Sequence, residues 1–144
     1  MKRNLSIIAL ACLALLAAAT LGSDESEYVA DAVDSICGLD DPRKLSHPAV
    51  VDHSSLMDVT PFIRRLRRER IDPKSAEGIV LTTKAQGLVR QKCGEVMREA
   101  GHCSIWRRIR RRDGRPIPDV TALVRKRIEG HTETATAAVV SRRT

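Results

Sequence analysis

The chain has 144 residues and a formal net charge of +7 at pH 7, and 30% of its residues are charged. This length accommodates one small domain with a modest core. Because the sequence holds a single Trp, a single Tyr and a single Phe, that core must be aliphatic. The same shortage argues against stacking on single-stranded nucleic acid, which needs exposed aromatic side chains among the basic ones.

Residues 1–22 have the three-part pattern of a secretory signal peptide. Lys2 and Arg3 precede an apolar stretch over residues 5–19. The candidate cleavage positions are Ala19-Thr20 and Gly22-Ser23. The apolar stretch is shorter than the roughly 20 residues that a bilayer-spanning helix needs. We therefore expect an exported protein, secreted or periplasmic, with retention of the segment as a membrane anchor as the alternative.

Charge is divided unevenly along the rest of the chain. Residues 23–63 hold nine acidic and two basic side chains, whereas residues 64–144 hold nine acidic and 21 basic ones. Such asymmetry has two interpretations. Either the acidic part screens the basic part within the chain, or the basic part forms a surface for an anionic partner.

Hydrophobic periodicity predicts an all-α domain of four to five amphipathic helices over residues 23–129. Val29, Val33 and Ile36 recur at spacings typical of a first helix over residues 26–37. No sustained period follows over residues 39–57, which we expect to form a loop. A second helix is expected to begin with Thr60 as its N-cap and to end near residue 71.

The longest predicted helix covers residues 75–100 and forms the spine of the domain. Gly101 is the expected left-handed stop of this helix. A short helix capped by Ser104 is then expected to bury Trp106, followed by an Asp-Gly turn and a last helix over residues 119–128. Residues 130–144 have no clear core face, and we expect a flexible C-terminal tail.

Two arginine clusters are the strongest non-random feature of the sequence. The candidate anion-binding residues are Arg64, Arg65, Arg67, Arg68, Arg107, Arg108, Arg110, Arg111, Arg112 and Arg115. Guanidinium groups at this density suit acidic polysaccharide, lipid head groups or nucleic acid phosphates. They also suit a solvated helix face that is partly neutralised by the acidic segment. The partner therefore stays open between an anionic polymer, a membrane surface and an acidic protein, with no specific nucleic acid predicted.

Three cysteines remain after removal of the signal, Cys37, Cys93 and Cys103. In an oxidising compartment any two of them are candidates for a disulfide, and three buried thiols are the alternative. His47 and His102 extend the group toward a metal shell, but the paired short spacing of structural zinc ligands is missing. We predict no metal and no cofactor.

No arrangement of residues in the sequence indicates catalysis. The adjacent His102 and Cys103 lack an evident third orienting group, and no glycine-rich phosphate loop is found. We therefore expect a small exported protein with a structural or interaction role that is not an enzyme. The alternative is a binder of anionic surfaces that uses the two arginine clusters.

Overall fold

The computed structural model describes residues 26–141, with side chains described for residues 26–131. The predicted signal peptide and its two candidate cleavage positions lie outside the described residues. In chain order the elements are β1 (Tyr28–Val29), the 3-10 helix η1 (Ala32–Asp34), β2 (Ser35–Gly38), the 3-10 helix η2 (Pro42–Lys44), β3 (Pro48–Val50), α2 (His53–Val59), α3 (Pro61–Arg68), α4 (Ala76–Ala100), β4 (Ser104–Trp106), β5 (Arg110–Arg111) and α5 (Thr121–Ser141).

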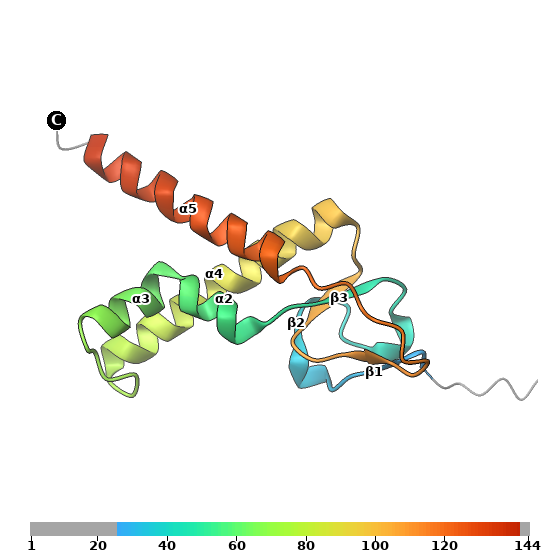
Figure 1. The fold of residues 1–144 in the computed structure, drawn as a ribbon. Coiled ribbons are helices and arrows are strands. Elements are labelled where there is room, and N and C mark those ends of the chain that lie inside the picture. The colour runs from blue at the N-terminus through green and yellow to red at the C-terminus, as the bar shows by residue number, and fades with distance from the viewer. Residues whose placement is uncertain (1–25, 142–144) are drawn as a thin grey trace, which may run out of the picture.

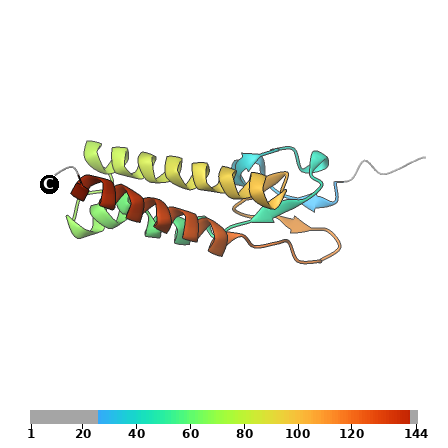
Figure 2. The ribbon, with the colours of Figure 1, turned by 90° about the horizontal axis from the view of Figure 1, so that it is seen from above.

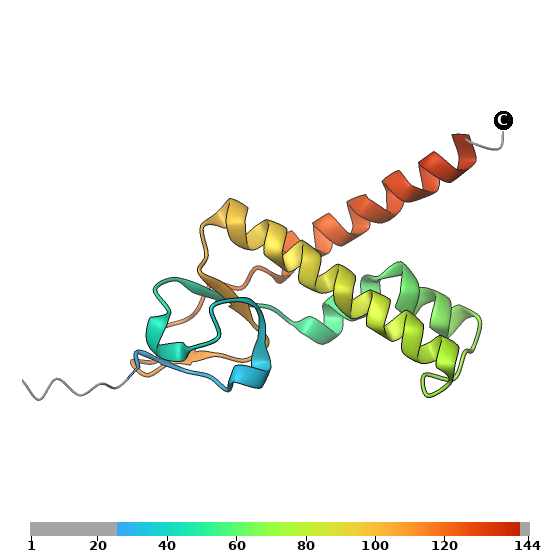
Figure 3. The ribbon, with the colours of Figure 1, turned by 180° about the vertical axis from the view of Figure 1, so that it is seen from behind.

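The fold is mixed α/β, so the all-α prediction is wrong. β4 is the central strand of a three-stranded sheet and pairs antiparallel with β2 and parallel with β3. A second, two-stranded sheet pairs β1 with β5. The strands lie around the C-terminal end of α4, and α3 lies beside its N-terminal part (Figure 1). The first part of α5 packs against the C-terminal half of α4, and the helix then diverges from α4 and extends away from the strands (Figures 2 and 3).

The strand β4 is buried on both faces. Successive side chains of a strand point to opposite faces of the sheet. Ile105 therefore joins the main core between the sheet and the helices, whereas Trp106 joins a smaller cluster with Tyr28 and Leu45. Ile105 and Trp106 are both fully buried. The prediction that Trp106 lies in the core is confirmed, although it lies in the smaller of these two clusters.

The helices with clear local signals form as predicted. Thr60 accepts the N–H of Ile63 at 3.3 Å and caps α3. α4 runs over the predicted spine, and Gly101 ends it in the left-handed conformation with φ 73°. Its periodic apolar positions, among them Leu81 and Val89, are buried. The second helix and the spine are therefore confirmed.

The other predicted elements need correction. The residues expected to form the first helix form β1, η1 and β2, and the short helix expected after Ser104 is replaced by β4 and β5. The expected loop over residues 39–57 contains β3 and most of α2. The last helix continues to Ser141, through residues expected to form part of the tail. No helix among the described residues combines the length and apolar character that a membrane span requires.

Gly38 provides a test of the sheet's close packing. It ends β2 with φ 89°, and a Cβ atom there would lie 2.4 Å from the carbonyl oxygen of Cys103. Gly38→Ala is expected to destabilise the fold by roughly 2–5 kcal/mol, because a left-handed backbone penalty and a backbone clash add together. The measurement is urea unfolding followed by circular dichroism.

Gly101→Ala is the matched control for this substitution. Gly101 also has a positive φ, but nothing lies within 4 Å of the added Cβ atom. This variant is expected to lose only about 1–2 kcal/mol, the left-handed penalty alone. Equal losses in the two variants would show that Gly38 is required for its backbone conformation and not for the approach of β4.

Candidate functional site

The arginines that follow β4 meet the acidic side chains of the N-terminal segment. Arg108 binds Asp34 through two hydrogen bonds, from Nε at 3.0 Å and from a terminal nitrogen at 3.2 Å. The Asp34 carboxylate is largely buried, whereas the Arg108 side chain is mostly exposed. Two-point pairing of this kind is stronger than a single contact and fixes the orientation of the guanidinium group.

A second set of pairs joins β5 and the following turn to the start of β1. Arg111 pairs with both Glu27 and Asp113, and its guanidinium lies 5.6 Å from the centre of the Tyr28 ring. Arg115 donates to Asp113 at 2.7 Å, and this bond, with further bonds from Arg115 and Arg111, holds the pKa of Asp113 well below its usual range. We call the pairs of Glu27 and Asp34 with Arg108, Arg111 and Arg115 the charge clasp.

Arg112 contacts the same N-terminal stretch through backbone carbonyl oxygens. Its Nε donates to the carbonyl oxygen of Ser26 at 2.7 Å, and its backbone N–H donates to the carbonyl oxygen of Glu27. This arginine therefore also connects the 107–115 segment to the start of β1.

The arginines of α3 are largely paired as well. Arg65 bridges Glu69 at 2.9 Å and Glu77 at 2.8 Å, and so links α3 to the start of α4. The remaining pairs are Arg67 with Asp58 and Arg68 with Glu69. These are exposed pairs, and each contributes little stability on its own. The α3 cluster and the 107–115 cluster lie on different elements, each with its own carboxylates.

Three of the ten predicted arginines have no carboxylate partner within residues 26–131, namely Arg64, Arg107 and Arg110. Arg107 lines a hollow of about 310 Å³ together with His53 and Arg90. Sequence reasoning missed His53 and Arg90, which lie outside both clusters. The spacing of Thr83, Gln86 and Arg90 was the available signal, because residues three and four apart share one face of a helix.

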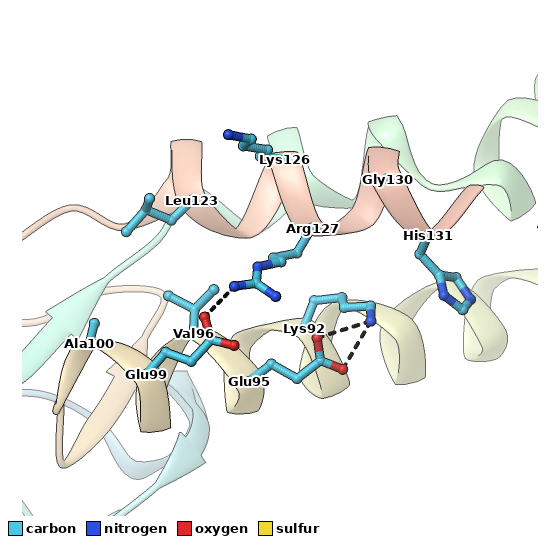
Figure 4. A pocket seen from close by; sticks show the side chains of 10 residues that line it. All are labelled: Lys92, Glu95, Val96, Glu99, Ala100, Leu123, Lys126, Arg127, Gly130 and His131. Carbon is cyan, nitrogen blue, oxygen red and sulfur yellow. Dashed lines mark hydrogen bonds and ion pairs between the residues drawn. The ribbon is translucent and has the colours of Figure 1, made fainter. Parts of the chain in front are cut away.

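A second concave region lies between α4 and α5, with a volume of about 630 Å³. Figure 4 shows Arg127 reaching from α5 to Glu99 on α4, while Lys92 pairs with Glu95 on α4 itself. The Lys92 ammonium lies 2.9 and 3.0 Å from the two carboxylate oxygens of Glu95 and lowers the pKa of that carboxyl. Two charged pairs of the groove are therefore satisfied internally, and the Arg127–Glu99 pair connects the two helices.

The three described cysteines are free thiols. Cys37 lies 3.9 Å from the sulfur of Met97, and burial raises the pKa of the fully buried Cys93 to about 12. Cys103 is partly buried, and its sulfur accepts the backbone N–H of His47, whose ring stacks on that of His102 at 4.6 Å. Among the described residues, no group of three or more His, Cys, Asp or Glu side chains is arranged to hold a metal ion.

The chain matches no family model, no curated protein and no solved structure. The functional argument therefore rests on the geometry described above.

The environment of Cys103 predicts a difference in thiol reactivity. Burial alone would raise the pKa of Cys103, but the backbone N–H of His47 and the hydroxyl of Ser104 donate to the sulfur and lower it. A lower pKa puts more thiolate, the reactive form, at about pH 7. In a native chain without residues 1–22, iodoacetamide is therefore expected to modify Cys103 first and Cys93 last, as read by peptide mass spectrometry.

Two controls define this experiment. In denaturant all three thiols are expected to react at similar rates, because the fold no longer sets their environments. Cys103→Ser is expected to remove the fast phase in the native protein. Modification of native Cys93 as fast as Cys103 would contradict the burial of Cys93.

Proposed function

We propose that the protein is exported and serves as a non-catalytic structural or interaction protein whose basic half is screened by its own acidic segment. The charge clasp is the observation that carries this proposal. Glu27 and Asp34 hold arginines that lie more than 70 residues further along the chain. Export is proposed from the signal-like pattern of residues 1–22.

The clasp limits what the 107–115 segment can offer to an external anion. A guanidinium group has five N–H donors, and a carboxylate bound at two points occupies two of them. Arg108 and Arg111 are engaged in this way with Asp34 and Asp113. Further donors of each group remain, but the bound carboxylate offsets its charge, so the cluster seen in the sequence overstates the net positive charge that an anionic polymer would meet.

A binder of anionic surfaces is the second candidate function. Arg64, Arg107 and Arg110 favour it, because they have no carboxylate partner within residues 26–131. These three side chains come from α3, from the residue after β4 and from β5. Because these arginines lie on different elements, they favour a few separate cationic contact sites over one continuous basic surface.

Retention on heparin across a salt series separates the two functions. The mature wild-type chain is expected to leave the column below about 0.15 M salt, near physiological ionic strength. The double variant Glu27→Gln, Asp34→Asn is expected to elute at higher salt, because it frees arginines of the clasp. The elution position of each protein is the measurement, with thermal unfolding as the check on folding.

Asp40→Asn, Glu129→Gln is the matched control, since both carboxylates are exposed and have no partner among the described residues. It changes the net charge equally and is expected to elute close to the wild type. Tight wild-type retention that falls steeply with salt, with no further gain in the clasp variant, would contradict the screened state and support the anionic-surface binder. Glu27→Gln alone, at an exposed site, repeats the test without touching the buried Asp34.

A further inference from the structure

A hollow with cationic walls forms where four parts of the chain meet. It is lined by Ser35 and Ile36 of β2, His53 of α2, one face of α4, and Arg107 after β4. The α4 residues in this wall include Thr83, Gln86 and Arg90, which lie one turn apart along the helix. The wall is therefore built from rigid elements that the core holds together.

None of the residues that line this hollow is acidic. Arg90 and Arg107 both reach it, and neither pairs with a carboxylate within residues 26–131. Most other arginines of the described chain do have such a partner. Two unpaired guanidinium groups beside one concave surface whose lining holds no carboxylate create a local positive potential that attracts an anion.

The carboxylates of the adjoining depression are engaged in contacts of their own. Asp34 binds Arg108, and its buried carboxylate is occupied at two points. Asp52 accepts the N–H of Ser55 and the hydroxyl of Ser54 at the start of α2. Asp119 accepts the N–H of Thr121 at the start of α5. These three acids line an adjoining depression that shares His53 and Arg107 with the hollow, and none of them lines the hollow itself.

The pKa of the His53 imidazole is lowered, and burial is the larger of its two causes. Burial lowers its pKa, the charge of Arg107 lowers it further, and Asp52 opposes both effects. His53 is therefore mainly neutral at neutral pH, where it offers one N–H donor to a ligand. An anion placed between His53 and Arg107 would offset the repulsion and raise the pKa of the imidazole.

We propose that the hollow formed by Arg90, Arg107 and His53 is a binding site for a tetrahedral oxyanion, either free phosphate or the phosphate group of a monoester. Its donors come from four parts of the chain, namely the guanidinium groups of Arg90 on α4 and Arg107 after β4, the imidazole of His53 on α2 and the hydroxyl of Ser35 on β2. Converging donors of this kind suit the oxygens of a tetrahedral anion, and arginine is well matched to phosphate. The volume of about 310 Å³ leaves room for the organic part of a monoester.

Isothermal titration calorimetry of the mature chain with inorganic phosphate tests the site, at an ionic strength held constant with chloride. Saturable one-to-one binding is expected, and Arg107→Gln and Arg90→Gln are each expected to weaken it about tenfold, because each removes a charged donor. The same titration is carried out with phenyl phosphate, sulfate and acetate, and their affinities are compared with that of phosphate. Tighter binding of phenyl phosphate than of phosphate would assign the site to a monoester, and the reverse would assign it to the free ion.

Arg64→Gln is the matched control, because Arg64 is an exposed arginine without a carboxylate partner in the described part of the chain and does not line the hollow. It is expected to bind phosphate as the wild type does. The imidazole signal of His53, followed by NMR across pH, is expected to show a higher pKa when phosphate is present. Equal weakening by Arg64→Gln, acetate binding as tight as phosphate, or no saturable binding would overturn the proposal.

Discussion

The fold depends on a three-residue strand that is buried on both sides. β4 contributes Ile105 to the main core and Trp106 to the cluster with Tyr28 and Leu45, and it pairs with β2 on one edge and β3 on the other. The indole N–H of Trp106 donates to the hydroxyl of Ser104 at 2.7 Å, which satisfies a polar group inside the core. Because one short strand joins two clusters and two distant segments, its position also sets where Arg107 and Arg108 leave the sheet.

The sequence predicted the elements whose signals are local and missed those whose partners are distant. Thr60 at the start of α3 and Gly101 at the end of α4 mark their helices within a few residues, so both helices were predictable. The strands have two to four residues each, too short to show a period of two. Ser104 illustrates the ambiguity, because it fits a helix cap as well as a strand. Its bond to Trp106, two residues on, requires a strand, in which such residues share one face.

The candidate sites divide in the same way. The two arginine clusters were evident from the sequence. The charge asymmetry was evident too, and screening of the basic part by the acidic part was one of its two interpretations. Which arginine meets which carboxylate was not predictable, since Asp34 and Arg108 are 74 residues apart. Arg90 and His53 escaped notice because each is isolated in the sequence. Only the packing of α4 against α2 and β2 brings them near Arg107.

The adjacent Arg107 and Arg108 thus have different roles, because Asp34 contacts the side chain of one and the backbone of the other. The Asp34 carboxylate accepts two hydrogen bonds from the guanidinium of Arg108. The Asp34 carbonyl oxygen accepts the backbone N–H of Arg107 at 2.8 Å. The N–H contact fixes the backbone of Arg107, while the carboxylate is no longer available to neutralise its side chain. The pairing that screens one guanidinium group therefore leaves the next one unscreened beside His53. In this chain a stabilising ion pair and an anion-binding hollow follow from the same buried acid.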